Sequence, residues 1–366
     1  MKFKSRSRLP WNKVLLAAFT AFSGCEAYAF PANARLGYSN CQSCHISPTG
    51  SGALNAYGAS TANEISTWAP FETYEDDGAS PYIVGADTRF LWTKLESTKR
   101  NAEVAFLMQT DFELGLTYSG VTGVVQFGQY YSEPKDIQGS YRHYLMYQYR
   151  KHSLRVGKFA PVFGLNEPDH TLPGRAALGF DGRRGASYNA EYVYADKRWA
   201  VNLTGIGGCQ GGLIKGQEFC ENKGFVGYSA HLTWSPNKIV TTGLSNAFLT
   251  KIILEEEDGE EESKLLNAVS WVVGTKQYYT LGELALASLL EKEETTYQGW
   301  VDFMLVPVRG LSVGYSLKLY QGNRKVYGTK AVWLPVAGLE FNFSWMREFS
   351  TEANADTFLF LTHAYL

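Results

Sequence analysis

From about residue 82, apolar residues alternate with polar or small residues in segments of roughly ten residues. In segment 339–348, Leu339 and Phe341 share one face, whereas Glu340 and Asn342 share the other. Segments 225–234 and 142–150 alternate in the same way. Successive side chains of a β-strand point to opposite faces, so each segment predicts a strand with one apolar face. Repeated strands of this kind are typical of a transmembrane β-barrel.

The connections between these segments predict how many strands there are. Bacterial outer-membrane barrels join strands by short turns on the periplasmic side and by longer loops outside. Short turns are expected near residues 119–120, 151–152, 196–197, 235–237, 275–276, 308–310 and 336–337. Longer or more polar connections are expected at residues 97–101, 133–138, 163–184, 208–223, 255–264, 291–294, 321–324 and 350–356. Residues 81–366 are therefore predicted to form an all-β, antiparallel barrel of about sixteen strands, closed by segment 357–366.

Composition narrows the alternatives. The formal net charge is −2, and 14% of the residues are aromatic. This charge gives no electrostatic basis for nucleic-acid binding. The rival all-β fold is a soluble sandwich, which gives no reason for turns and loops to alternate in length or for Trp and Tyr to gather near strand ends. The pattern favours the barrel, and hence a location in the bacterial outer membrane in contact with its lipid.

Residues 1–29 have the pattern of a secretory signal peptide. A basic start precedes an apolar stretch from Val14 to Phe22 that is too short to span a bilayer, and Ala27-Tyr28-Ala29 fits a cleavage site before Phe30. The alternative is a lipoprotein box that leaves Cys25 lipidated at the new N-terminus. Either way, the sequence predicts export, with residues 30–80 forming a separate short segment ahead of the barrel.

That short segment contains Cys41-Gln42-Ser43-Cys44-His45. In a Cys-x-x-Cys-His motif, two thiols attach one haem covalently and the histidine ligates its iron. The alternatives are a redox dithiol, which requires a surrounding βαβ unit, and half of a zinc site, which requires a second ligand pair nearby. The sequence has neither feature, so we expect one haem c bound by Cys41 and Cys44, with His45 as proximal ligand. Segment 30–80 is too short and too rich in small residues for a globular cytochrome core, and we expect it to enter the lumen as a plug.

The second axial ligand is not local, because no Met and no further His occurs between residues 46 and 107. It would have to come from the inward face of the barrel. The alternation makes His231, His363 and Met146 candidates, and Met304 and Met346 share the same inward pattern. Each of these also has the simpler interpretation of an ordinary lumen residue, and a five-coordinate iron is a further alternative.

The order of haem motif and barrel resembles the fused outer-membrane monohaem cytochrome–porins, best known as iron oxidases. Residues 29–35, Ala-Phe-Pro-Ala-Asn-Ala-Arg, resemble the lead-in of that family, with Asn33 in place of Phe and Arg35 six residues before Cys41. The sequence departs from the family pattern at Leu36-Gly37-Tyr38 and after His45. The resemblance implies a ferrous-iron oxidase or a related electron-transfer protein, and these departures leave the donor open.

Three further features lie in the predicted outer connections. Connection 163–184 contains Arg175, Arg183 and Arg184, which could reach haem propionates if this loop folds inward, or otherwise lie in solvent. Cys209 and Cys220 share one connection and are predicted to form a structural disulfide. The acidic run 255–262 could concentrate Fe²⁺ or another cationic donor, although such runs are more often simply solvated.

Taken together, the sequence predicts electron transfer across the outer membrane through one haem. An extracellular donor or acceptor, Fe(II) or another, would exchange an electron with a periplasmic c-type cytochrome, in a direction that the sequence leaves open. Two alternatives come from other classes of protein. A passive diffusion porin would have a peripheral haem segment, and a haem-based sensor would have a five-coordinate iron that binds small gases.

Overall fold

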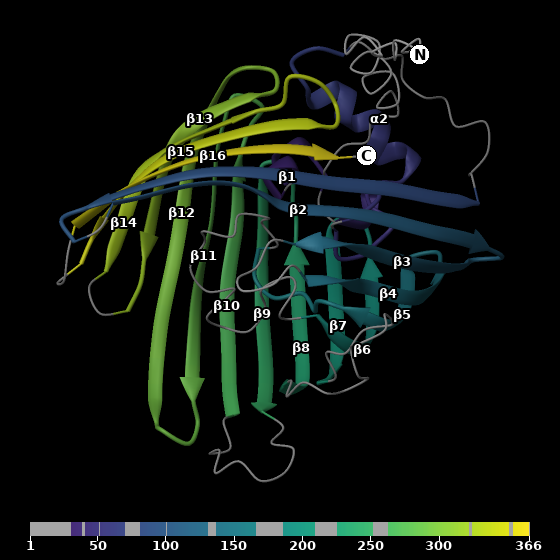
Figure 1. Ribbon diagram of the computed structural model, residues 1–366. Helices are drawn as coiled ribbons and strands as arrows, with labels where there is room; N and C mark the ends of the chain where they lie inside the picture. Colours follow the sequence, from purple (N-terminus) through teal and green to yellow (C-terminus); the bar gives the residue numbers. More distant parts are fainter. Residues whose placement is uncertain are drawn as a thin grey trace, which may run out of the picture.

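The computed structural model shows a barrel with a short helical segment at one mouth (Figure 1). It describes residues 31–38, 41–50, 52–69, 81–99, 101–130, 137–165, 186–208, 225–251, 263–321, 324–350 and 354–365. The signal-peptide prediction for residues 1–29, including Cys25, lies outside these residues.

The barrel contains the sixteen strands that the alternation predicts. Their bounds are β1 Tyr82–Ser97, β2 Asn101–Tyr118, β3 Val121–Tyr130, β4 Ile137–Tyr149, β5 His152–Phe159, β6 Ser187–Ala195, β7 Trp199–Gly207, β8 Phe225–Trp234, β9 Val240–Lys251, β10 Ser263–Gly274, β11 Tyr278–Leu289, β12 Glu294–Val308, β13 Leu311–Leu319, β14 Lys325–Trp333, β15 Leu339–Phe349 and β16 Asn354–Tyr365.

Each strand pairs antiparallel with its neighbour in sequence, and β1 pairs with β16 to close the sheet. The closing register places Phe90 opposite Thr362. Closure removes both sheet edges, so the paired backbone groups of the strands are satisfied within the wall, as a hydrocarbon environment requires. The predicted closed antiparallel barrel is confirmed.

The connections follow the predicted alternation only in part. All seven predicted turns occur at one end of the barrel, although the turn between β4 and β5 is Arg150-Lys151 and not 151–152. At the other end, the connections β1–β2 and β11–β12 are as tight as those turns, so the expectation of longer loops throughout is wrong there. The physical reason is strand length: β1 and β2 have 16 and 18 residues, more than the roughly ten needed to cross a membrane, so their hairpin extends past the membrane and closes tightly.

The outer face of the barrel is apolar. Exposed large side chains around the wall include those of Leu114, Leu145, Leu244, Leu284 and Phe343. Aromatic residues stand exposed beside the turns at the end with the seven turns, namely Tyr118, Tyr149, Trp199, Trp234 and Tyr278. An apolar band bordered by aromatic residues is the lipid-facing surface of an outer-membrane barrel. The end with the seven turns is the periplasmic one, and we call it the periplasmic mouth.

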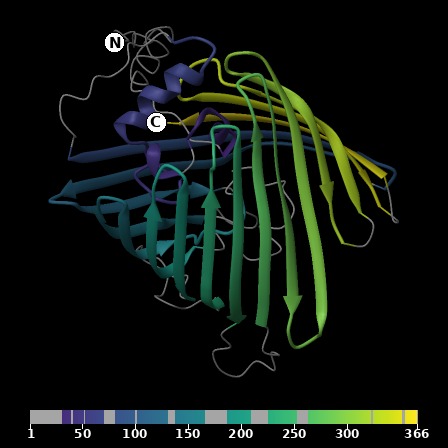
Figure 2. The same cartoon turned by 180° about the vertical axis from the view of Figure 1, so that it is seen from behind.

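The segment ahead of the barrel contains two 3-10 helices, η1 Pro31–Leu36 and η2 Cys41–Ser43, and one α-helix, α2 Ala56–Ile65. The Asn55 side chain caps α2 by accepting a hydrogen bond from the Gly58 N–H at 2.8 Å. Figures 1 and 2 both show α2 at the periplasmic mouth. Among the described residues, no helix has the length and apolar character needed to span a bilayer.

Candidate haem site

Cys41, Cys44 and His45 lie on a single turn of helix. The Cys41 carbonyl accepts hydrogen bonds from the Cys44 N–H at 3.1 Å and the His45 N–H at 2.9 Å. Residues at i, i+3 and i+4 of a helical turn share one face. Neither cysteine is in a disulfide, so two thiols and one imidazole are gathered on one side of the turn.

The His45 ring is held by the chain that follows it. Its Nδ1 lies 3.2 Å from the Gly52 carbonyl oxygen, and the His45 side chain is only 2% exposed. The backbone of His45 also forms a β-bridge with Leu54. A hydrogen bond from Nδ1 to a carbonyl fixes the tautomer and ring orientation of a ligating histidine. Nε2 is then the nitrogen that would ligate iron, and the donor set fits a haem c.

The Cys44 side chain is buried, and that of Cys41 is half-buried. Burial raises the pKa of both the Cys41 and the Cys44 thiol to about 11. Helix α2 covers the motif so closely that a Cβ at Gly58 would collide with the Cys44 carbonyl. Thiols in such a place stay protonated near neutral pH, which disfavours the alternative of a reactive dithiol.

A buried ion pair of the barrel wall anchors the residues that follow the motif. Arg155 of β5 donates hydrogen bonds to the Ser47 hydroxyl at 3.0 Å and the Thr49 hydroxyl at 3.2 Å. Its guanidinium also lies 2.6 Å from the carboxylate of Glu191 on β6. Just before Cys44, the Gln42 amide donates to the Ser153 hydroxyl at 2.7 Å.

A second ion pair, between side chains of β2 and β4, holds the far end of the same loop. The Glu113 carboxylate of β2 accepts a hydrogen bond from the Ala53 N–H at 2.9 Å and pairs with Arg142 of β4 at 2.8 Å. Gly52 lies directly on this pair with φ +76, and a Cβ there would come within 2.5 Å of the Arg142 guanidinium. Only glycine combines that backbone conformation with so close an approach. Chain 47–53 is therefore fastened to inward side chains of the wall.

These contacts fix the depth of the segment. Ser153 lies two residues beyond the turn residue Lys151, which corresponds to about 7 Å along the strand. Glu113 lies five residues from Tyr118 at the end of β2, or roughly 17 Å along the strand. The helical turn with Cys41 and Cys44 thus sits near the periplasmic mouth, and the loop after it reaches further into the lumen.

The two histidine candidates for a second axial ligand face the lumen as predicted, but their nitrogens are already engaged. His231 Nδ1 lies 2.7 Å from the Ser245 hydroxyl, and its Nε2 lies 3.0 Å from the Thr233 hydroxyl. His363 bridges two carboxylates, with Nδ1 3.2 Å from Glu340 and Nε2 3.2 Å from Asp87. Ligation of iron by either would require breaking these contacts.

Met146 has different surroundings. It is 2% exposed and belongs to an apolar cluster with Ala53, against which Ile46 also packs. Ile46 and Ala53 flank the loop from His45 to Leu54, so Met146 shares an apolar cluster with residues adjacent to the motif. A thioether in apolar surroundings has no competing hydrogen bond to lose.

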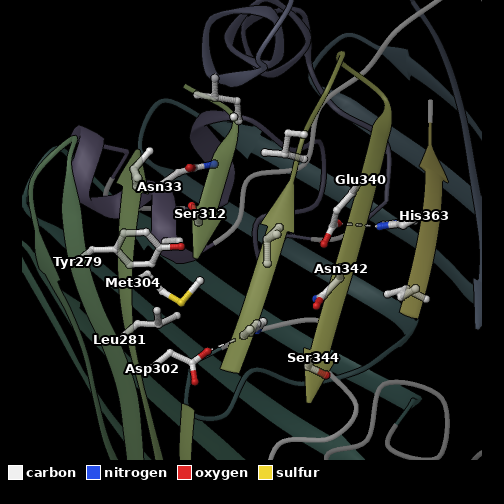
Figure 3. A pocket seen from close by; sticks show the side chains of 18 of the residues that line it. Asn33, Tyr279, Leu281, Asp302, Met304, Ser312, Glu340, Asn342, Ser344 and His363 are labelled. Carbon is white, nitrogen blue, oxygen red and sulfur yellow. Dashed lines mark hydrogen bonds and ion pairs between the residues drawn. The ribbon is translucent and has the colours of Figure 1, made fainter. Parts of the chain in front are cut away.

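Met304 and Met346 also face inward, and Met304 lines a cavity of about 140 Å³ beside the segment. Figure 3 shows this cavity between the wall and Asn33 of η1, with Tyr279, Asp302, Glu340 and His363 turned toward it. The cavity wall mixes apolar side chains with the ion pair of Asp302 and Lys330 at 3.4 Å. Cys41, Cys44 and His45 do not line it.

The long connection after β5 begins inside the lumen. The Gly164 N–H donates to the Ser245 hydroxyl at 2.8 Å, and the Leu165 N–H donates to the Glu283 carboxylate at 2.6 Å. Phe163 is 2% exposed in an apolar cluster with Ala247 and Leu266. This start agrees with an inward-folded connection, whereas Arg175, Arg183 and Arg184 lie outside the described residues.

Two other predictions also fall outside the described residues: the disulfide between Cys209 and Cys220, and the acidic run 255–262. Within the described part of the chain, no group of three or more His, Cys, Asp or Glu side chains has the geometry of a metal site. Arg150, the last residue of the predicted segment 142–150, lies in the turn after β4 with φ +53.

Sequence reasoning missed the anchors of the segment. Glu113, Arg155 and Glu191 occupy inward strand positions, and a charged residue there signals a lumen contact. Their partners Ser47 and Ala53 lie far away in the sequence, so no local pattern joins them.

The fold and its apolar outer belt define a sixteen-strand, porin-like barrel of the bacterial outer membrane. Three solved structures share this fold, each at a TM-score of 0.56. The chain is similar to a loop-deletion mutant of OmpT, an outer membrane protein of Vibrio cholerae, at 8% identity, covering 78% of this chain and 100% of that one. It is similar to the outer membrane channel DcaP of Acinetobacter baumannii at 8% identity, covering 78% and 97%.

The third is Salmonella typhi OmpF in complex with daunomycin, at 9% identity, covering 77% of this chain and 98% of that one. At these identities the likeness extends to the fold alone. No protein-family model matches the chain. No curated protein matches it either.

Proposed function

We propose that the protein is an outer-membrane electron-transfer barrel that binds one haem c through Cys41 and Cys44, with His45 as proximal ligand. The observation that carries this proposal is the helical turn with two thiols and one imidazole on a single face, held inside the barrel mouth. When bound, the haem supplies one-electron chemistry at its iron. This is the function implied by the resemblance to the fused cytochrome–porins.

The residues of this chain orient and enclose the site. The Gly52 carbonyl holds Nδ1 of His45 and so orients the ring with Nε2 as the nitrogen that would ligate iron. Arg155 and Glu113 fasten the following loop to the wall. Cys44 packs in an apolar cluster with Leu54 and Ala62, which limits water near the thiols. Low dielectric and fixed ligand geometry are the means by which a protein sets a haem potential.

The position of the site near the periplasmic mouth supports a different route for each redox partner, the periplasmic cytochrome and the extracellular donor. A periplasmic c-type cytochrome would approach the mouth directly, because the motif lies about 7 Å along the strand from the turn residues. A donor from outside would have to enter the lumen, which suits a small one such as Fe(II). The cavity beside the segment is lined by the carboxylates of Asp302 and Glu340 and by the bases Arg35, Arg89 and Lys330, so its charge selects neither sign of donor. The donor would lose one electron and the cytochrome would gain it, and the direction would reverse with the relative potentials.

The test is a redox titration by optical spectroscopy on purified, detergent-solubilised protein, followed by addition of Fe²⁺ to the oxidised form. We expect one haem per chain and reduction by Fe²⁺. The matched control is the double variant Cys41→Ala, Cys44→Ala, which should show no covalent haem. A wild-type haem that Fe²⁺ leaves oxidised would reject the iron-oxidase form, and absence of haem would reject the proposal.

A second candidate function is passive diffusion, and it is favoured by the fold comparisons. DcaP, one of the similar structures, is described as an outer membrane channel. The cavity beside η1 would form the first part of a water-filled path through the barrel. Against an open path stand the anchored loop 47–53 and the start of the connection at Phe163, both of which pack on inward side chains of the wall.

Planar-bilayer conductance separates the two functions. A diffusion porin gives large, stable conductance steps for the wild-type protein. The plugged barrel gives small steps, which grow when the anchors of loop 47–53 are removed by Ser47→Ala and Thr49→Ala.

A further inference from the structure

The turns of the periplasmic mouth carry a concentration of basic residues. The exposed bases in the seven turns are Arg150, Lys151, Lys197, Arg198, Lys238, Lys276 and Arg309. All seven turns lie within the described residues, and Asp196 is the one acidic residue in them. Asp196 is itself paired with Lys151 at 3.2 Å. We call this set of seven bases the basic ring.

The basic ring surrounds the haem-motif segment. The Arg309 guanidinium donates to the Thr67 carbonyl at 3.2 Å. The turn holding Lys276 accepts hydrogen bonds from Arg35 of η1, at 2.8 Å through the Thr275 carbonyl. The Lys238 side chain lies against Gly37. The ring therefore frames the same opening that holds the helical turn of Cys41 and Cys44.

The positive charge at this mouth contrasts with the chain as a whole. The formal net charge of the whole sequence is −2, whereas the seven turns, all within the described residues, carry seven bases and one acidic residue. The described residues of the plug add Glu64 as one exposed carboxylate and Arg35 as one base, so they do not neutralise the ring. A surface of one sign around an opening steers a partner of opposite sign toward it.

We propose that the basic ring is the docking surface for the acidic face of a periplasmic redox protein, an inference that rests on the proposed electron-transfer function. The position of the bases favours a protein over anionic lipid headgroups. Lys238 and Arg309 contact the segment that fills the mouth, and thus lie toward the opening and away from the surrounding bilayer. A partner seated there would face the helical turn of Cys41 and Cys44 across a short distance.

Binding can be measured with one probe in two charge states. Succinylated horse-heart cytochrome c carries carboxylates in place of lysine amines, and the unmodified protein is its basic counterpart. Association with the full-length protein in nanodiscs would be followed by biolayer interferometry at several salt concentrations. We expect association of the succinylated probe only, with a rate that falls steeply as salt increases.

The variant Lys197→Glu, Lys238→Glu, Lys276→Glu reverses three ring charges. We expect it to slow association about tenfold or more, since charge steering changes association rates by up to several powers of ten. The matched control Lys99→Glu, Lys292→Glu, Lys325→Glu reverses three exposed bases at the other end of the barrel and should leave the rate unchanged. Far-ultraviolet circular dichroism of both variants confirms folding.

Two results would overturn the docking surface. One is an association rate that is equal for the succinylated and the unmodified probe, or equal for the ring variant and the control variant with the succinylated probe. The other is a ring variant that loses affinity for phosphatidylglycerol vesicles but binds the succinylated probe normally, which would assign the ring to lipid. Probe binding needs no haem, so a protein that binds the probe but has no reducible haem would reject only the proposed function. A reducible haem without ring-dependent binding would reject only the docking surface.

Discussion

Arg155 Nη2 lies 2.6 Å from Glu191 Oε2, and the two side chains are 1% and 0% exposed. The same guanidinium donates to the Ser47 hydroxyl and stacks on the Phe159 ring, 3.7 Å from its centroid. A single buried cation thus joins the barrel wall to the chain that follows the Cys-x-x-Cys-His motif. The carboxylate fixes the arginine, and the arginine fixes the loop.

Arg155→Met should therefore destabilise the barrel and release the loop together. It leaves the Glu191 carboxylate buried without its cation, which costs about 3–5 kcal/mol. Urea unfolding in lipid vesicles, followed by tryptophan fluorescence, measures this loss. The double variant Ser47→Ala, Thr49→Ala keeps the Arg155–Glu191 pair and should lose only about 1–3 kcal/mol while making the segment sensitive to protease. A stability of Arg155→Met equal to that of the wild type would contradict this role.

Gly58→Ala should reduce haem incorporation although alanine favours helix. Alanine gains about 1 kcal/mol over glycine in a helix interior. At this position, however, the added methyl group meets the Cys44 carbonyl, so α2 must move away from the motif. We expect a haem content several-fold below that of the wild type, measured by haem staining of the purified chain. Ser60→Ala on the same helix is the control and should retain full haem content.

Met146 is the residue that we expect to complete the iron coordination. Met146→Leu conserves volume, and thus costs under about 1.5 kcal/mol in packing, but it removes the sulfur. The haem potential should fall, because a methionine ligand raises it. Optical spectroscopy would detect the loss of the sulfur–iron absorption band. Met346→Leu and His363→Gln are controls that should leave the spectrum unchanged, and a spectral change in His363→Gln alone would assign the ligand to that histidine.

The turn around Asp196 should make stability depend on pH. The Arg198 N–H, the Lys151 ammonium and the Trp199 N–H lower the pKa of Asp196 from 3.8 to about 2. The stabilisation is therefore present above the unfolded-state value and is lost as pH falls through about 2.

Asp196→Asn should consequently lower the heat stability of the folded band on gels near neutral pH, and the difference from the wild type should shrink in acid. Asn237→Ala is a matched control, because Asn237 accepts from the Ile239 and Val240 N–H groups without carrying charge. Its effect should not change with pH. An Asp196→Asn effect of equal size at all pH values would contradict the linkage.

Strand periodicity was enough to predict the barrel. Inward Glu340 and Met346 and outward Phe343 occupy the faces that the alternation assigns, because one side of each strand meets lipid and the other meets the lumen. Connection lengths were less informative. The hairpin of β1 and β2 extends past the membrane and closes with a tight turn. The length of this connection therefore does not distinguish the outer end of the barrel from the periplasmic mouth.

The candidate site could be predicted only in its local part. Cys41, Cys44 and His45 are neighbours in sequence, and one helical turn brings them together. Glu113 and Arg155 reach the same loop from two strands that are far from it in sequence. Closure of the barrel creates those contacts, and no spacing along the chain encodes them.

The mass of the intact purified chain, produced with c-type cytochrome maturation, tests the central claim most directly. We predict a mass equal to that of the mature polypeptide plus one haem, and a haem-free mass for Cys41→Ala, Cys44→Ala. A wild-type chain that carries no haem under these conditions would contradict the account and leave a porin-like barrel with a structural plug.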